Sequence, residues 1–243
     1  MVRDGALNCV VVFGREPRPG GVKTRLARGI GDQAAAAVYG VLLEATLRHA
    51  SAEEIVAWAV GLGGTTIATT SMGRNAAVML HLVAQVDRSL PTIWVDTGYN
   101  LRDTYIVAER LIADLDVNIH VYSPLITSER RNAIMGGIPT VDEEQRHREF
   151  TEQVKLEPFA RALADFKPDI WLTGIRREET ELRKTLDIVS RDDRGIIKVA
   201  PLFYWSEEQV EEYMGRHELP SCRHYFDPTK VHDGRECGLH TAA

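Results

Sequence analysis

One cysteine near the C-terminus has neighbours that favour nucleophilic chemistry. Cys237 stands between Arg235 and His240 in the run Arg-Glu-Cys-Gly-Leu-His. A nearby cation stabilises the thiolate, which is the reactive form of cysteine, so this setting predicts a nucleophile. The residues after Pro220 are rich in Pro, Asp, His and Gly, and we expect a flexible arm that carries Cys237 into a pocket and out to a partner thiol. The alternative is an incidental cysteine in a tail.

A loop of small hydroxyl residues is the first candidate for binding an anion. Residues 69–75 read Thr-Thr-Ser-Met-Gly-Arg-Asn and join a β-branched stretch to a predicted helix. Hydroxyl groups and backbone N–H groups at a helix N-terminus suit phosphate or sulfate oxygens. The expected anion-binding residues are Thr69, Thr70, Ser71 and Gly73. A plain N-capping turn would use the same residue types.

Asp96 and Thr97 form a second polar segment at the end of a predicted strand. Gly98 follows them and permits a tight turn. The Asp96 carboxylate could accept a hydrogen bond from a ribose hydroxyl or an adenine amine. The alternative is that Asp96 caps the next helix.

Three arginines after another predicted strand are candidates for binding phosphate. Arg176 and Arg177 are adjacent, and Arg183 follows in the same loop. Guanidinium groups bind phosphate in a bidentate manner, which favours a nucleotide phosphate as the ligand. In the alternative, the cations belong to a solvated surface and are neutralised by their acidic neighbours, Glu178, Glu179 and Glu181.

These segments must be positioned by alternating strands and helices. The predicted strands cover residues 8–13, 65–70, 92–95, 118–122, 170–173 and 196–200, and the predicted helices cover residues 32–49, 76–85, 102–114 and 156–166. This order predicts an α/β fold, a doubly wound and mostly parallel sheet with helices on both faces. Ligands bind such sheets at the carboxyl ends of the strands, which directs attention to the loops after Thr70, Val95 and Thr173. Residues 128–154 are polar and weakly periodic, and we expect a mobile segment there.

Composition excludes several classes of protein. The net charge of -6 argues against nucleic acid as a partner, and no stretch approaches the roughly 20 apolar residues of a membrane span. The N-terminus lacks the apolar run of a signal peptide, so a cytoplasmic location is expected. Three cysteines cannot form a four-thiolate cluster or a zinc site of the Cys-x-x-Cys type. Cys9 is expected to be a buried apolar residue, and Cys222 is either a spare thiol or a resolving thiol for Cys237.

Taken in order, five segments resemble the phosphoadenylyl sulfate reductase family of the adenine-nucleotide α-hydrolase-like group. They are Ile-Trp-Val-Asp-Thr-Gly-Tyr at 93–99, Lys-Leu-Glu-Pro at 155–158, Gly-Ile-Arg-Arg-Glu at 174–178, Lys-Val-Ala-Pro-Leu at 198–202, and Arg-Glu-Cys-Gly-Leu-His at 235–240. The resemblance runs from about residue 51 to the C-terminus.

The resemblance implies a reaction of assimilatory sulfate reduction and a role for each matching residue. Cys237 attacks the sulfur of phosphoadenylyl sulfate (PAPS), expels adenosine 3',5'-bisphosphate and becomes an S-sulfocysteine. Thioredoxin or glutaredoxin then releases sulfite, and no cofactor is bound. The residues implied to bind substrate are Thr69, Thr70, Ser71, Gly73, Asp96, Thr97, Lys155, Arg176, Arg177, Arg183, Arg235 and His240. The absence of a cysteine-held cluster favours PAPS over adenylyl sulfate (APS).

Other functions stay open at this point. The family often has serines and an aromatic residue where this chain has residues 69–72, and its tail before Cys237 is often longer. The chain could be an APS reductase without a cluster or a non-catalytic adenine-nucleotide-binding module. An ATP pyrophosphatase is disfavoured because residues 69–75 lack its Ser-Gly-Gly-x-Asp-Ser signature.

Three parts of the chain are expected. Residues 1–50 form an N-terminal βα extension, residues 51–219 a nucleotide-binding reductase domain, and residues 220–243 the arm that carries Cys237. Residues 13–26 resemble the opening of a nucleotide-sugar-transferase-like family, but Val22 breaks the glycine-lysine-threonine spacing of a phosphate-binding P-loop. The extension is expected to be structural or to form a homodimer.

Overall fold

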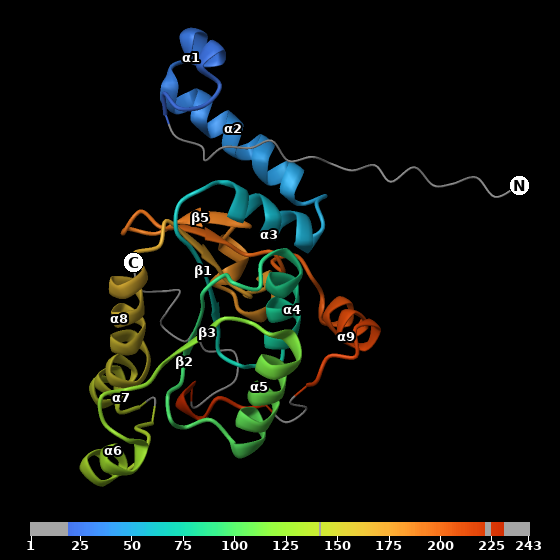
Figure 1. The fold of residues 1–243 in the computed structure, drawn as a ribbon. Coiled ribbons are helices and arrows are strands. Elements are labelled where there is room, and N and C mark those ends of the chain that lie inside the picture. Colours follow the sequence, from blue (N-terminus) through green and yellow to red (C-terminus); the bar gives the residue numbers. More distant parts are fainter. Residues whose placement is uncertain (1–18, 141, 222–224, 231–243) are drawn as a thin grey trace, which may run out of the picture.

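The computed structural model describes residues 19–140, 142–221 and 225–230. Its centre is a six-stranded sheet with the strand order β3-β2-β1-β4-β6-β5 (Figure 1). The strands are β1 (Thr66–Thr70), β2 (Thr92–Val95), β3 (Ile119–Tyr122), β4 (Ile170–Leu172), β5 (Val189–Arg191) and β6 (Ile197–Val199). All pairs are parallel except β5 with β6.

The strand order reverses at β1. From β1 the chain adds β2 and β3 on one side, and it then crosses over to place β4 on the other side. In the register, Thr66 pairs with Ile170 and Ala68 pairs with Leu172. A doubly wound sheet separates its neighbouring loops at such a reversal, and this leaves a crevice at the carboxyl ends of the two strands.

Helices cover both faces of the sheet, in the places that Figure 1 shows. The helices of the described chain are α1 (Thr24–Ile30), α2 (Asp32–Leu47), α3 (Ala52–Gly61), α4 (Ala76–Val86), α5 (Arg102–Leu115), α6 (Ser128–Met135), α7 (Glu144–Thr151), α8 (Glu157–Phe166) and α9 (Glu207–Arg216). The helices α3, α4 and α5 pack on one face of the sheet and α8 packs on the other, whereas α1 and most of α2 project away from the sheet. A π-helix, Glu152–Leu156, joins α7 to α8, and short 3-10 helices span Arg177–Glu179, Arg183–Thr185 and Pro228–Lys230.

Alternating side chains divide the apolar core between the two faces. Ile67, Ile93 and Trp171 are buried with Phe159 of α8 on one face. Ala68 and Leu172 point to the opposite face, where they belong to the core that α3 and α4 cover. Because successive strand residues face opposite ways, strands that are buried on both faces need continuous apolar runs, as in Ile170–Leu172.

The helix α2 joins the predicted N-terminal extension to this core. Leu43 and Leu47 are buried in the same apolar cluster as Trp58 of α3. The Glu44 carboxylate accepts a hydrogen bond of 3.3 Å from the Tyr204 hydroxyl. The end of α2 is therefore packed on residues of α3 and of the segment that follows β6.

The predicted α/β fold with a mostly parallel sheet is confirmed. Residues 128–154, for which a mobile segment and no helix was predicted, contain α6, α7 and the start of the π-helix. Thr127 caps α6, and Phe150 and Val154 are fully buried, so tertiary contacts stabilise helices that the weak periodicity did not reveal. The antiparallel edge strand β5 was not predicted. The predicted strand over 8–13 and most of the predicted arm lie outside the described residues.

Candidate functional site

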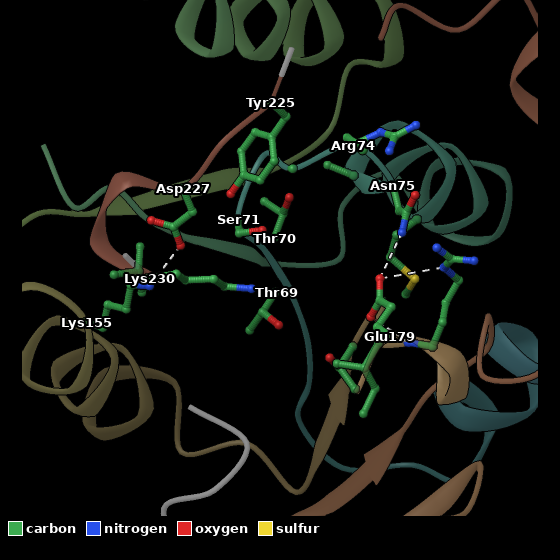
Figure 2. A pocket seen from close by; sticks show the side chains of 18 of the residues that line it. Thr69, Thr70, Ser71, Arg74, Asn75, Lys155, Glu179, Tyr225, Asp227 and Lys230 are labelled. Atoms are coloured by element: carbon green, nitrogen blue, oxygen red, sulfur yellow. Dashed lines mark hydrogen bonds and ion pairs between the residues drawn. The ribbon is translucent and has the colours of Figure 1, made fainter. Parts of the chain in front are cut away.

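A cavity of about 520 Å³ lies at the carboxyl ends of β1, β2 and β4. Its walls include the ends of the strands, the loop before α4, the arginine loop after β4, the π-helix and the segment 225–230. Figure 2 shows the polar side chains that surround it. The cavity is at the reversal of strand order, where this fold class is expected to bind its ligand.

All four predicted residues of the hydroxyl loop line the cavity. The Thr69 hydroxyl accepts a hydrogen bond of 2.8 Å from Trp171 Nε1, and the Thr70 hydroxyl accepts one of 3.0 Å from the Met72 backbone N–H. Met72 is buried and has a φ of 53°, which bends the loop sharply toward α4. A Cβ at Gly73 would lie only 3.3 Å from the Tyr225 ring. The loop is thus shaped by its own hydroxyl groups and closed over by Tyr225.

The structure separates Asp96 from Thr97. Thr97 is buried and lines the cavity, whereas Asp96 does not line it. Asp96 Oδ1 accepts hydrogen bonds from the Gly98 N–H, from Asn100 Nδ2 and from the Tyr105 hydroxyl, the last of 2.7 Å. Burial, together with the Asp96 carboxylate, raises the pKa of Tyr105 to about 12, so the phenol keeps its proton and its hydrogen bond. In this geometry Asp96 orders the loop after β2.

Two of the three predicted arginines reach the cavity. Arg176 and Arg183 are buried and line it. Arg177 is exposed, and its guanidinium lies 5.8 Å from the centre of the Tyr204 ring, while its backbone N–H donates to Phe203. Arg176 has an extended backbone, whereas Arg177 begins the 3-10 helix Arg177–Glu179, so the two side chains leave the loop in different directions and do not act as a pair.

Carboxylates already occupy the guanidinium groups of this wall. Arg176 Nη1 donates to Glu178 at 2.6 Å, and its Nη2 contacts Glu207. Glu179 contacts Arg183 and accepts a hydrogen bond of 3.1 Å from Asn75 Nδ2. Neutralisation by Glu178 and Glu179, the alternative that the sequence left open, is therefore present at the cavity itself.

Two buried polar atoms of this wall have no hydrogen-bond partner among the described residues. They are Arg176 Nε, one donor, and Asn75 Oδ1, one acceptor. Asn75 also begins the N-terminal turn of α4. A buried donor or acceptor without a partner is costly, so a polar ligand in the cavity would stabilise both.

A buried ion pair forms the opposite wall. Lys155 Nζ, on the π-helix, donates to Asp227 Oδ2 at 2.9 Å, and the two side chains are 7% and 10% exposed. The other carboxylate oxygen, Oδ1, accepts hydrogen bonds from the Thr229 N–H and hydroxyl. Burial raises the pKa of Asp227, but the Lys155 ammonium and the Thr229 donors outweigh burial and hold the pKa below its ordinary value. The carboxylate is thus charged and fixed.

Sequence reasoning missed three lining residues on the segment 225–230: Tyr225, Asp227 and Lys230. The segment has no periodicity, and its contact with Lys155 joins positions 72 residues apart. The predicted nucleophile Cys237, its neighbours Arg235 and His240, and Cys9 and Cys222 lie outside the described residues. Over the ranges that the structure describes, no cluster of three or more His, Cys, Asp or Glu residues could hold a metal ion. Within the same ranges, every helix is too short or too polar to cross a membrane.

Comparisons with known proteins agree on one family. The profile of the phosphoadenosine phosphosulfate reductase domain matches residues 65–228. The chain is 33% identical over 223 residues to the phosphoadenosine 5'-phosphosulfate reductase of Synechocystis sp., covering 82% of this chain and 89% of that protein. It is 34% identical over 183 residues to the enzyme of the same name from Salmonella choleraesuis, covering 73% of this chain and 72% of that protein.

Solved structures give the same result for the fold. The phosphoadenylyl-sulfate reductase of Candida auris, solved as a phosphate complex, superimposes with a TM-score of 0.64 at 26% identity, covering 74% of this chain and 85% of that chain. An FMN adenylyltransferase from Candida glabrata superimposes with a TM-score of 0.51 at 14% identity, which shows a shared fold alone.

Proposed function

The chain belongs to the phosphoadenosine phosphosulfate reductase family and is an enzyme of that reductase type, and we propose that it reduces PAPS to sulfite through an S-sulfocysteine at Cys237. The observation that carries this proposal is the cavity at the reversal of strand order. It joins a hydroxyl loop, buried arginines and a buried lysine in a volume suited to one nucleotide, since small-molecule sites span roughly 300–1,000 Å³.

In the first step, the Cys237 thiolate attacks the sulfur of the sulfate group. A sulfur–sulfur bond forms, and the bond between that sulfur and the bridging oxygen breaks. The oxygen keeps the electron pair and leaves on adenosine 3',5'-bisphosphate, with S-sulfocysteine on the enzyme. Cations around the cavity stabilise the charge that develops on the leaving phosphate, a role proposed for Lys155, Arg176 and Arg183.

In the second step, a thiolate of reduced thioredoxin or glutaredoxin attacks Cys237 Sγ. Sulfite leaves with the electron pair of the sulfur–sulfur bond, and a mixed disulfide remains. The donor's second thiol resolves that disulfide and restores the Cys237 thiol. The donor is oxidised by two electrons, and the sulfate sulfur is reduced by two, so no further cofactor is required.

Chain length supports the assignment of the nucleophile. Seven peptide links separate Lys230, which lines the cavity, from Cys237. A chain of that length spans at most about 25 Å, because each residue extends the chain by no more than about 3.6 Å. The covalent structure therefore keeps the thiol within reach of the cavity.

The remaining parts of the proposal concern substrate and setting. Three cysteines cannot supply the four thiolates of an iron-sulfur cluster, which supports PAPS over APS as substrate. A thiol cycle that depends on reduced thioredoxin suits the cytoplasm. We also propose a homodimer. For individual side chains, we propose that Thr69, Thr70, Ser71, Gly73 and Thr97 contact the nucleotide and that Arg235 and His240 also bind substrate.

Sulfite release with reduced thioredoxin tests this function. Wild type, Cys237→Ser and the control Cys222→Ser would each be given PAPS or APS. We expect release from PAPS by wild type and by Cys222→Ser, and none by Cys237→Ser. Equal rates from APS would contradict the proposed substrate. If the protein bound adenosine 3',5'-bisphosphate but released no sulfite from either nucleotide, it would be a nucleotide-binding module without this activity.

A further inference from the structure

Lys230 is a basic residue of the cavity that the predicted site did not include. It ends the short 3-10 helix Pro228–Lys230 and lines the cavity. Figure 2 shows its side chain pointing into the cavity, toward Thr69 and Ser71 of the hydroxyl loop. Its position thus faces the loop that is suited to an oxyanion.

The lack of an ion pair among the described residues distinguishes Lys230 from the other basic residues of the cavity. Arg74 lies 3.1 Å from Glu207, and Lys155 lies 2.9 Å from Asp227. Arg176 and Arg183 are paired with the carboxylates of the arginine loop. Lys230, in contrast, forms no ion pair with any residue in the described part of the chain. An uncompensated cation that faces a hydroxyl loop attracts an anion more strongly than one that is already paired.

Hydrogen bonds to Asp227 hold the backbone around Lys230 in place. The Lys230 N–H donates to the Asp227 carbonyl at 3.0 Å, and Thr229 is buried with its hydroxyl on the Asp227 carboxylate. That carboxylate is fixed in turn by the buried ammonium of Lys155. The ion pair therefore anchors the segment, and the segment presents Lys230 to the cavity.

We propose that Lys230 is a substrate-binding residue whose ammonium contacts one of the two phosphate groups of the nucleotide at the hydroxyl loop. This inference rests on the proposed function. The 3'-phosphate and the 5' group are both tetrahedral oxyanions, and both suit an ammonium donor.

Binding of adenosine 3',5'-bisphosphate, measured by titration calorimetry at low salt, tests the inference. The variants are Lys230→Met, Lys230→Arg and the control Lys184→Met, whose exposed lysine pairs with Glu181 outside the cavity. We expect Lys230→Met to weaken binding about tenfold, as loss of one charge-assisted hydrogen bond would. Lys230→Arg should retain most of the affinity, and Lys184→Met should match wild type.

Adenosine 5'-monophosphate and adenosine 3'-monophosphate identify the group that Lys230 contacts. The monophosphate that carries this group should lose affinity in Lys230→Met, and the other should not. In the sulfite assay, the same variant should raise KM for PAPS with a smaller change in kcat, as expected for a binding contact. Equal unfolding midpoints for Lys230→Met and wild type would exclude misfolding as the cause.

The outcomes separate this inference from the proposed function. If Lys230→Met binds adenosine 3',5'-bisphosphate as tightly as wild type, the assignment of Lys230 is wrong, whereas sulfite release would still support the reductase. If the wild type binds the nucleotide through Lys230 but releases no sulfite, Lys230 is a binding residue and the proposed reaction is wrong. If the wild type binds no adenine nucleotide, both are overturned.

Discussion

The two walls of the cavity carry their charge in different ways. On the arginine wall, Arg176 and Arg183 face carboxylates of their own loop and of α9, so their charges are compensated before any ligand binds. On the opposite wall, Asp227 is fixed between Lys155 and Thr229, and Lys230 lines the cavity with no carboxylate partner in the part of the chain that the structure describes. One wall is neutral and internally bonded, and the other supplies positive charge.

This difference shows how an acidic protein can prepare an anion site. Buried cations without partners would repel one another and destabilise the empty cavity. Carboxylates on the arginine wall offset that cost, and a phosphate ligand of the proposed kind would have to compete with them for the guanidinium groups. The segment 225–230 avoids this competition, because Lys230 has no ion pair among the described residues and the segment is held by a separate ion pair, Lys155 with Asp227.

The largest expected effect comes from breaking the ion pair between Lys155 and Asp227, which anchors the wall opposite the arginines. Asp227→Asn leaves the buried Lys155 ammonium without its partner, and we expect the free energy of unfolding to fall by about 3 kcal/mol. Urea denaturation at neutral pH measures this loss. A double variant, Lys155→Met with Asp227→Leu, should recover much of it, because an apolar pair can replace a buried ion pair. If Asp227→Asn and wild type had the same free energy of unfolding, the ion pair would not anchor this segment.

The same pair gives a pH dependence with a defined sign. The pKa of Asp227 is lower in the folded protein than in the unfolded chain, so its stabilisation is complete above the ordinary carboxyl pKa of about 4. It is lost as the pH falls through the lower pKa of the folded state. The stability difference between wild type and Asp227→Asn should therefore shrink below about pH 4.

A smaller effect, of opposite sign, is expected on the arginine wall. Glu179→Gln removes the carboxylate that faces Arg183 and Asn75. We expect adenosine 3',5'-bisphosphate to bind about three to tenfold more tightly, and the gain should diminish with added salt. The matched control is Glu181→Gln, whose side chain is 88% exposed and pairs with Lys184. Weaker binding by Glu179→Gln would mean that this carboxylate contacts the ligand favourably.

The smallest effect is expected at Arg177. Its guanidinium lies over Tyr204 and outside the cavity, so Arg177→Ala should change nucleotide affinity by less than about twofold. Loss of the contact with the ring should cost roughly 0.5 kcal/mol of stability. Titration calorimetry would compare the nucleotide affinity of Arg177→Ala with that of Arg176→Ala, which we expect to bind the nucleotide far more weakly. If Arg177→Ala bound the nucleotide tenfold more weakly than wild type, Arg177 would have to contact the nucleotide.

The contrast between the walls also separates what the sequence predicts from what it does not. The strands over 92–95 and 170–173 are short apolar runs before polar loops. Because the carboxyl ends of parallel strands meet at one edge of a sheet, Thr97 and Arg176 could be predicted at the cavity. Lys155 was found through the resemblance of its segment to a family motif. Local pattern could not show that Arg177 points away from Arg176, because the direction of a loop side chain is set by tertiary contacts.

Long-range contacts explain the other failures. Asp227 and Lys230 reach the cavity through an ion pair with a distant residue, and nothing in their own neighbourhood indicates it. The helices α6 and α7 are short and mostly polar in sequence, yet Arg131 of α6 and Phe150 of α7 are buried against the rest of the fold. In both regions, structure depends on partners that are remote in the sequence.

The parallel pairing of β1 with β4 has a consequence for the time course of folding. Thr66 pairs with Ile170, so closing the centre of the sheet brings together positions 104 residues apart. Such closure is slow, because the entropy of the intervening chain is lost before the new contacts form. During synthesis on the ribosome, the hydroxyl loop would emerge long before β4, and the cavity between them would be among the last features to form.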